Sequence, residues 1–379
     1  MVKVLCVIMT KFFEGGGLST VMLNYYRELW QWPVYADRLQ IDFLSHGDIK
    51  DELRAEIEAH GCHFFSMPGR KSNPIGHYRT FDTVLRNGNY DVLHYNCNSG
   101  LDGLELAIAK KYVNNRICHI HNSSPRYPLG HRILVGTLRR SYTKAVAVSE
   151  ESGRWLYGDG ADFEVLNNAI DVHKFSYDAT VRERKRAELG VGDNTFVVGS
   201  IGRMKKGDQK NTGFLIRVFA LAHKRMPDSR LVIVGDGDLR PRWEHMASEL
   251  SVADAIDFLG FRTDVAEWMQ AFDVFCFPSR WEGLPLAAVE AQAAGLPVLA
   301  SETIPHEIGI TPLVSFLPIG EEDERAWADE ILLRAKEPLP KRGDPDIAQN
   351  LSVSGYDIRH EVEKLVALYG LTQDVVTVR

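Results

Sequence analysis

The chain has 379 residues, which is too many for one compact core and fits two domains of ordinary size. Hydrophobic residues make up 45% of it and charged residues 25%, a composition that excludes a largely disordered protein. The 44 basic and 51 acidic residues give a formal charge of −7, which excludes a protein that mainly binds nucleic-acid phosphates. The five cysteines have no CxxC or zinc-site spacing, so we expect reduced structural thiols in a cytoplasmic protein.

Short apolar runs alternate with longer stretches of helical period along the chain, a pattern typical of parallel sheets covered by helices. The first half predicts strands at residues 2–9, 39–44, 62–67, 91–95, 117–121, 145–148 and 164–167. The second half predicts strands at residues 196–201, 231–234, 256–259, 274–277, 298–300 and 314–317. The first run is too short to span a membrane, and we expect it to be a buried strand.

Residues 171–189 are the expected crossing between two α/β domains. We expect a first domain over residues 1–170, completed by a C-terminal helix within residues 355–379, and a second domain over residues 171–354. Such sheets bind ligands at the carboxyl ends of their strands, so two of them predict a two-lobed enzyme with its substrate in the cleft between the lobes.

A glycine-rich loop, Gly15–Gly17, follows the first strand and precedes a helix. Glycines let the backbone approach a phosphate or a sugar there, and the N-terminus of the helix adds its dipole. The loop does not match the dinucleotide-binding fingerprint, because Leu18 and Val21 stand where a later glycine is needed and the next strand does not end in an acid.

The strand at residues 117–121 carries His119 and His121, which point the same way because they lie two residues apart. The sequence offers no third metal ligand at a suitable spacing, so we expect no metal site here. The surrounding segment Leu106–Ser149 has no Asp or Glu and eight Lys or Arg residues. Its mixture of cations with apolar residues such as Leu129 and Ile133 suits docking on an anionic membrane; the alternative is that the cations are dispersed over several faces.

In the second half, the strand at residues 196–201 is followed by a loop with four cations, Arg203, Lys205, Lys206 and Lys210. Fixed cations at the carboxyl end of a strand can stabilise the negative charge of a departing nucleotide diphosphate without a metal. The alternative is an ordinary basic surface loop.

The most informative stretch follows the strand at residues 274–277 and leads into an alanine-rich helix that ends at Gly295. It carries Glu282 and Glu290, whose carboxylates would lie about 80° apart around a continuous helix. Pro285 breaks that helix, which places Glu282 in the loop and Glu290 on the second turn. Both glutamates then flank the N-terminus of the helix.

The backbone N–H groups freed around Gly283 and Leu284 make that terminus a candidate phosphate site, whereas two solvated surface acids are the alternative. The sequence Val-Phe-Cys-Phe-Pro-Ser-Arg-Trp-Glu-Gly-Leu-Pro resembles the retaining glycosyltransferases of family 4, of the GT-B type. Their signature is a pair of glutamates separated by seven residues, after a strand that ends in Pro-Ser. The resemblance is strongest over Val198–Pro305, and it implies two Rossmann-like domains that face each other across a cleft.

The resemblance implies a catalytic role for the charged residues. Glu282 would contact hydroxyl groups of the donor sugar, and Glu290 would hold the ribose of the nucleotide. Arg203 and Lys210 would stabilise the diphosphate, although the gap between them is longer than the family's, so Lys205 or Lys206 is an alternative to Lys210. We prefer Lys210 because Gln-Lys-Asn resembles the usual family sequence at this point.

The first half matches the family less closely. His121 would hydrogen bond to the transferred glycosyl group, Gly16 and Gly17 would line the donor and acceptor site, and Asn168 would be structural. In the second half, Phe261 and Arg262 lie in the segment that would receive the base. The Asp-x-Asp of residues 236–238 has the form of a divalent-metal motif, but it resembles the family's Gly-Asp-Gly turn.

From the resemblance we expect a retaining transferase that moves a hexose or N-acetylhexosamine from a UDP-sugar to a polysaccharide or lipid-linked saccharide in exopolysaccharide or capsule biosynthesis. It would need neither a metal nor another cofactor, and it would be cytoplasmic, either soluble or peripheral at the inner face of the plasma membrane. The alternatives are another two-lobed nucleotide-sugar enzyme, such as an epimerase or a sugar-phosphate synthase, and a catalytically silent partner subunit.

Overall fold

The computed structural model describes residues 1–13, 17–122, 127–283, 285–337 and 342–371. The chain forms two compact units, one of Met1–Ala169 together with the segment from Ile358, and one of Ile170–Asp357. Each unit is a parallel sheet with helices on both faces, which confirms the expected fold class. All of the strands expected from the sequence are present.

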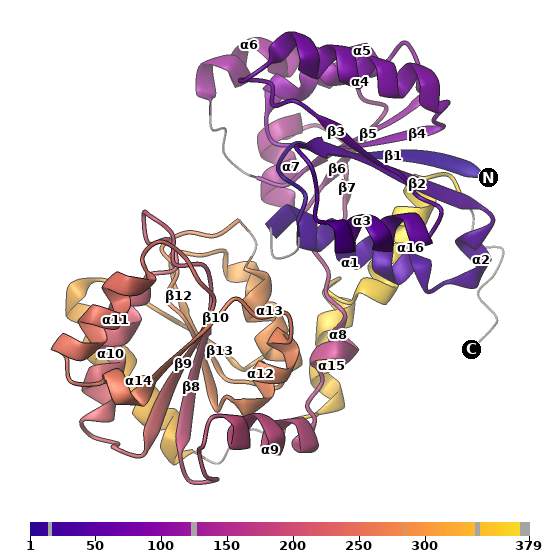
Figure 1. The fold of residues 1–379 in the computed structure, drawn as a ribbon. Helices are drawn as coiled ribbons and strands as arrows, with labels where there is room; N and C mark the ends of the chain where they lie inside the picture. The colour runs from indigo at the N-terminus through magenta and orange to yellow at the C-terminus, as the bar shows by residue number, and fades with distance from the viewer. Residues whose placement is uncertain (14–16, 123–126, 284, 338–341, 372–379) are drawn as a thin grey trace. The chain divides into compact units, whose positions relative to one another are not determined.

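The first unit is built on a sheet of seven parallel strands in the order β3-β2-β1-β4-β5-β6-β7. The strands are β1 (Val2–Ile8), β2 (Leu39–His46), β3 (Phe64–Met67), β4 (Val92–Cys97), β5 (Asn115–Ile120), β6 (Lys144–Ala147) and β7 (Glu164–Val165). The helices are α1 (Gly17–Trp30), α2 (Pro33–Ala36), α3 (Asp51–Ala59), α4 (Pro74–Gly88), α5 (Gly103–Ala109), α6 (Pro128–Arg139), α7 (Glu150–Tyr157) and α16 (Ile358–Leu368). In Figure 1, α4, α5 and α6 cover one face of this sheet, and α1, α3 and α16 cover the other.

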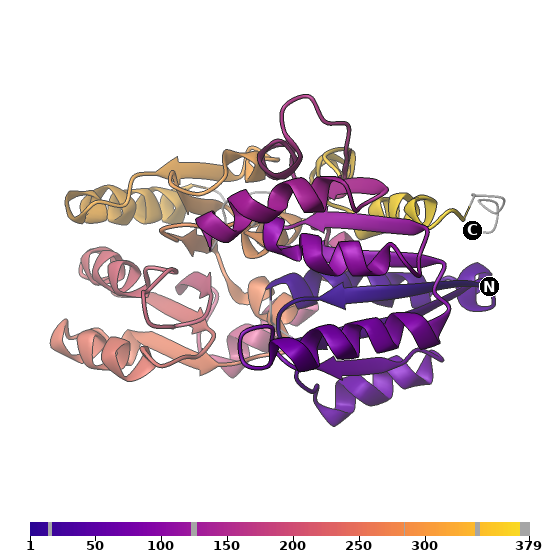
Figure 2. The same cartoon turned by 90° about the horizontal axis from the view of Figure 1, so that it is seen from above.

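The last helix, α16, folds back onto the first unit and packs beside α1. Its residues Val362, Leu365 and Val366 are fully buried, in agreement with their helical spacing in the sequence. Just beyond the helix, the hydroxyl groups of Tyr369 and Tyr26 lie 3.0 Å apart. The yellow helix therefore lies beside the indigo N-terminal elements in Figures 1 and 2.

The second unit is built on a sheet of six parallel strands in the order β10-β9-β8-β11-β12-β13. The strands are β8 (Phe196–Ile201), β9 (Ser229–Val234), β10 (Ile256–Gly260), β11 (Val274–Phe277), β12 (Val298–Ser301) and β13 (Val314–Leu317). The helices are α8 (Val172–Phe175), α9 (Ala179–Glu188), α10 (Thr212–His223), α11 (Arg240–Glu249), α12 (Val265–Ala271), α13 (Leu286–Ala293), α14 (Glu324–Lys336) and α15 (Pro345–Val353). Apolar side chains of α10, α11 and α14 form the core on one face, and those of α12 and α13 form the core on the other.

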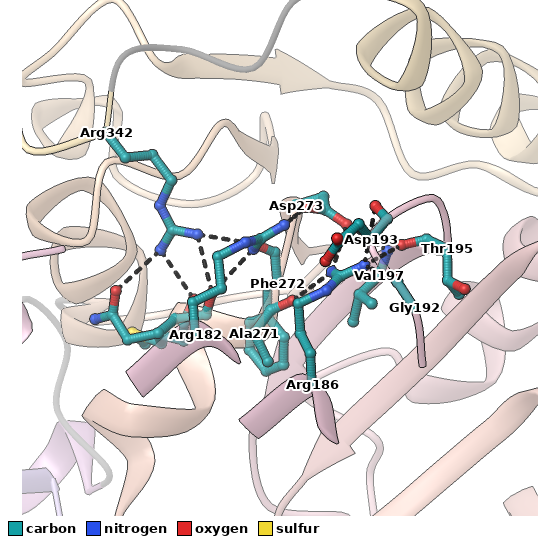
Figure 3. A network of polar contacts seen from close by, with 12 residues as sticks. Arg182, Arg186, Gly192, Asp193, Thr195, Val197, Ala271, Phe272, Asp273 and Arg342 are labelled. Carbon is teal, nitrogen blue, oxygen red and sulfur yellow. Dashed lines mark hydrogen bonds and ion pairs between the residues drawn. The ribbon is translucent and has the colours of Figure 1, made fainter. Parts of the chain in front are cut away.

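A buried polar network fixes the amino ends of β8 and β11 (Figure 3). Asp273 accepts hydrogen bonds from the guanidinium groups of Arg182 and Arg186 and, at 2.7 Å, from the backbone N–H of Val197. Arg342 donates to the carbonyl oxygens of Phe272, at 3.0 Å, and of other residues near the end of α12. The network lies at the amino edge of the sheet and so holds the strands whose opposite ends carry the candidate site.

Candidate functional site

The candidate site of the second unit is formed by loops at the carboxyl edge of its sheet. Arg203 follows β8, Phe261 follows β10, and Glu282 follows β11. Because β8 and β11 are neighbours, the loops that leave them lie side by side, although about 70 residues separate them in sequence. The sheet topology therefore brings the two charged motifs of the second half together.

Lys210 and Glu282 form an ion pair in which Nζ lies 2.7 Å from Oε1. The side chain of Lys210 is 24% exposed and that of Glu282 is 9% exposed, so the pair is screened from most of the solvent but remains accessible. The ammonium group also lies 4.5 Å from the centre of the Phe277 ring. A Cβ atom at Gly202 would lie 2.7 Å from Cγ of Lys210, so the glycine makes room for this lysine.

Hydrogen bonds between the two loops hold the ion pair in place. The side-chain N–H of Gln209 donates to the carbonyl oxygen of Trp281 at 2.8 Å and to Oε2 of Glu282 at 3.3 Å. The backbone N–H of Arg280 donates to the carbonyl oxygen of Gln209 at 2.8 Å, and its guanidinium donates to Oδ1 of Asn211 at 2.9 Å. The position of Glu282 is therefore fixed by both loops.

Glu290 lies on the second turn of α13, which begins at Leu286 directly after Pro285. Burial raises the pKa of Glu290 to about 7, and the positive charges of Lys174 and Lys210 oppose that rise. A carboxyl group with such a pKa changes its charge near neutral pH. Gly283 is exposed in the loop between β11 and α13, whereas Leu284 lies outside the described residues.

The cations that follow β8 differ in their surroundings. Lys205 and Lys206 are exposed, whereas Lys210 is half-buried and paired with Glu282. Arg203 is half-buried, and its burial lowers the pKa of its guanidinium. Of these three lysines, Lys210 is the one held against Glu282.

The loops that follow β9 and β10 complete this edge. At Gly235 the backbone φ is +137°, and a Cβ atom would lie 2.0 Å from the carbonyl oxygen of Gly202, so only glycine fits this close approach. Asp236 accepts a hydrogen bond from the N–H of Gly237 at 2.8 Å, as expected for a turn. Phe261 is 58% exposed.

Arg262 is less available than Phe261 for a ligand. Its Nε and Nη2 donate to the two carboxylate oxygens of Asp264, each at 2.8 Å. Its guanidinium also lies 5.6 Å from the ring centre of Trp268. Arg262 would therefore have to share or give up its ion pair with Asp264 in order to contact a nucleotide sugar.

In the first unit, His121 follows β5 and is held by a side chain of the neighbouring strand β4. Its Nε2 lies 2.8 Å from Oδ1 of Asn96, and the amide group of Asn96 donates to the carbonyl oxygen of Val7 at 3.0 Å. Because Oδ1 is the acceptor of this amide, Nε2 of His121 must carry a proton. Burial lowers the pKa of His121 to about 3, so His121 is neutral.

A chain of buried polar groups behind His121 was not predicted from the sequence. His94 joins Tyr369 to His119, because its Nδ1 lies 2.8 Å from the tyrosine hydroxyl and its Nε2 lies 3.0 Å from Nδ1 of His119. The rings of His119 and His121 are 4.1 Å apart. His119 is fully buried in this chain of neutral groups, as a structural residue would be.

The glycine-rich loop lies only partly in the described residues. Gly16 lies outside them, and Gly17 is the exposed first residue of α1. The hydroxyl of Ser19 accepts from the N–H of Phe13 and donates to the carbonyl oxygen of Lys11, both at 3.3 Å. These bonds tie the first turn of α1 to the end of β1.

Only some of the cations in the basic segment Leu106–Ser149 face the solvent. Arg116 is buried and donates to the carbonyl oxygens of Ser141 and Val113, both at 2.6 Å. Arg139 donates to the carbonyl oxygen of Leu156, which lies 3.0 Å from Nε and 2.8 Å from Nη2. The cations Lys110, Lys111, Arg132, Arg139 and Arg140 are exposed.

Comparisons with known proteins point to one class of enzyme. Residues 195–335 match the family model of glycosyl transferases group 1. Over 372 residues the chain is 29% identical to EpsF of Bacillus subtilis (strain 168), which is named as a glycosyltransferase; the match covers 95% of this chain and 94% of that protein. A 149-residue match is 35% identical to the Escherichia coli UDP-Gal:alpha-D-GlcNAc-diphosphoundecaprenol alpha-1,3-galactosyltransferase and covers 38% of each chain.

The fold is similar to that of Anabaena Alr3699/HepE, whose crystal structure contains UDP and glucose. The TM-score is 0.70 at 19% sequence identity, and the similarity covers 98% of both chains. The fold is therefore GT-B. All of the helices in the described part of the chain are too short or too polar to cross a bilayer.

Proposed function

We infer that this chain, a glycosyltransferase with the GT-B fold, is a retaining enzyme that moves a hexose or N-acetylhexosamine from a UDP-sugar to a polysaccharide or lipid-linked saccharide. The observation that carries the inference is the Lys210–Glu282 ion pair at the carboxyl edge of the second sheet, where the loop after β8 also carries Arg203. The UDP and glucose bound to HepE and the UDP-Gal named for the E. coli relative support a UDP-sugar as the donor.

The strand order suggests how the donor lies along this edge. Going from β10 to β11, the loops carry Phe261, the glycine turn of β9, Arg203 and then Glu282. These three strand spacings amount to about 14 Å. The base would lie at Phe261, the phosphates near Arg203 and Lys210, and the sugar at Glu282.

In this arrangement Lys210 exchanges partners when the donor binds. Its ammonium group leaves Glu282 for the diphosphate, and the freed carboxylate accepts hydrogen bonds from hydroxyl groups of the sugar. As the bond between the sugar and the phosphate breaks, Arg203 and Lys210 stabilise the charge of the nucleotide diphosphate without a metal. The departing phosphate takes the proton of the acceptor hydroxyl, which attacks from the same face.

A ligand screen followed by product analysis tests the function. At 100 times its dissociation constant, the correct nucleotide sugar stabilises the protein by about 2.7 kcal/mol, which a thermal-shift assay with UDP- and GDP-sugars detects. The products formed with and without a saccharide acceptor then distinguish transfer from epimerisation and from sugar-phosphate synthesis. A silent partner subunit would neither transfer the sugar nor hydrolyse the donor.

We further propose that α6 brings the enzyme to an anionic membrane at the inner face of the plasma membrane, close to a lipid-linked acceptor. Leu129 and Ile133 of this helix are 72% and 67% exposed, and exposed cations lie in the same segment. Such a surface gains from both the apolar and the anionic part of a bilayer.

Sedimentation with vesicles of anionic or neutral lipid tests this surface. Replacing Leu129 and Ile133 together by Glu should abolish binding to the anionic vesicles. Leu221→Glu, a change of an exposed leucine on α10, should leave it unchanged. Equal sedimentation of wild type with both kinds of vesicle would contradict an anionic-lipid surface.

A further inference from the structure

Trp281 is exposed in a way that sets it apart from the other tryptophans. All seven tryptophans lie in the described ranges, and Trp281 alone is mostly exposed, with 53% of its surface accessible. Among the described residues, its indole takes part in none of the aromatic stacks or cation–π contacts that engage Trp30, Trp155 and Trp268. Its large apolar ring offers a flat surface against which another molecule can pack.

The backbone of Trp281 is fixed although its side chain is open. Gln209 donates to the carbonyl oxygen of Trp281 at 2.8 Å. The preceding residue, Arg280, is bonded at both of its backbone groups, because its N–H donates to Gln209 at 2.8 Å and its carbonyl oxygen accepts from the hydroxyl of Thr303 at 2.9 Å. The indole is thus presented by a backbone that is already ordered, which lowers the entropy lost on binding.

Trp281 directly precedes Glu282, and the two side chains differ in direction. Glu282 is 9% exposed and bonds to Lys210, whereas the indole is open to solvent. A sugar held by Glu282 would lie on the protein side of this loop. A ring that meets Trp281 comes from the solvent side, and an acceptor that binds after the donor would have to come from that side.

We propose that Trp281 is an acceptor subsite, whose indole packs against a pyranose ring of the saccharide that receives the sugar. The inference rests on the proposed function and adds to it a residue for the acceptor. One face of a pyranose presents several C–H bonds, and these fit the electron-rich face of an indole while the hydroxyl groups at the ring edge stay in water. The nucleobase is a poorer occupant, because the proposed arrangement places it at Phe261, about 14 Å away.

Steady-state kinetics with Trp281→Ala and Trp281→Phe test the subsite. The donor is the UDP-sugar that binds best in the ligand screen, and the acceptors are octyl glycosides of glucose, galactose and N-acetylglucosamine. We expect the acceptor KM of Trp281→Ala to rise about tenfold, and that of Trp281→Phe to rise less because a smaller ring remains. Hydrolysis of the donor without acceptor should stay within about twofold of wild type, since stacking contributes only through the acceptor.

A second measurement follows the indole itself. The octyl glycoside that is extended fastest should protect part of the wild-type tryptophan fluorescence from quenching by iodide when UDP is present, because only Trp281 is largely open to solvent. Trp281→Phe should show no such protection. The control Val353→Ala, which removes an exposed apolar side chain on α15, should match wild type in both measurements.

The outcomes separate this inference from the proposed function. If wild type transfers sugar but Trp281→Ala keeps the wild-type acceptor KM, the acceptor subsite is refuted and the transferase is not. If Trp281→Ala loses donor hydrolysis as much as transfer, Trp281 acts on the donor and the acceptor subsite is again refuted. If wild type neither binds nor hydrolyses any nucleotide sugar, both fail together.

Discussion

The carboxyl group of Glu290 should make donor binding depend on pH around neutrality. Burial raises its pKa to about 7, and Lys174 and Lys210 are the charged groups that act on it. With this pKa, about one molecule in ten is ionised at pH 6 and about nine in ten at pH 8. Since the proposed contact with the ribose hydroxyls needs the carboxylate as acceptor, the Kd for UDP should fall about tenfold from pH 6 to pH 8.

The carboxyl group of Glu290 should lower the free energy of unfolding as the pH rises, whereas it strengthens UDP binding over the same range. Its pKa in the folded protein lies above the ordinary value of 4.5, so the neutral form favours folding. This contribution is complete below pH 4.5 and is lost as the pH rises through 7. Glu290→Gln keeps a neutral side chain at every pH and should therefore raise the free energy of unfolding by about 3 kcal/mol at pH 8, and by little at pH 4.5.

Isothermal titration with UDP at several pH values, together with urea unfolding, measures both effects. Glu290→Gln should bind UDP at least about tenfold more weakly than wild type at pH 8, and its Kd should lack the tenfold fall that Glu290 adds between pH 6 and pH 8. Glu183→Gln changes an exposed glutamate of α9 and serves as the matched control. A wild-type Kd that is constant from pH 6 to pH 8, or a Glu290→Gln protein that is less stable than wild type at pH 8, would refute the reasoning.

Two further changes test the supports of the site. Asp273→Ala leaves the guanidinium groups of Arg182 and Arg186 without their carboxylate. It should lower the free energy of unfolding, measured in urea titrations, by about 3 to 5 kcal/mol. A loss below about 1 kcal/mol would show that the network of Figure 3 holds the strands weakly. Lys210→Ala should lower kcat about a hundredfold in assays of sugar transfer, because it removes one cation that stabilises the departing diphosphate. A kcat near that of wild type would assign the stabilisation of the diphosphate to Lys205 or Lys206.

Many of the strands were predictable because they contain short apolar runs that end at polar residues, glycine or proline. The run at residues 274–277 is an example, since all four of its residues are buried in β11. The placement of Glu282 and Glu290 was also predictable, because Pro285 restricts where the helix between them can begin. Both predictions depend on residues that are close together in the sequence.

The ion pair of Lys210 with Glu282 and the contacts of the buried histidines could not be predicted without knowing the order of the strands. Nothing local in the sequence shows that the loop of Lys210 lies against the loop of Glu282, 72 residues later; the pairing of β8 with β11 brings them together. His94 and Tyr369 are 275 residues apart and meet because the last helix returns to the first unit. The spacing of His119 and His121 suggested only their common direction, and their polar partners come from other segments.

The most direct test of the account is sugar transfer by Glu282→Ala. The variant removes the carboxylate that pairs with Lys210, and a thermal-shift assay with UDP checks that it remains folded and still binds the nucleotide. We predict that wild type transfers sugar from its UDP-sugar donor to an octyl glycoside, and that folded Glu282→Ala gives no detectable product. Transfer by Glu282→Ala at the wild-type rate would contradict the assignment of this edge of the second sheet as the active site.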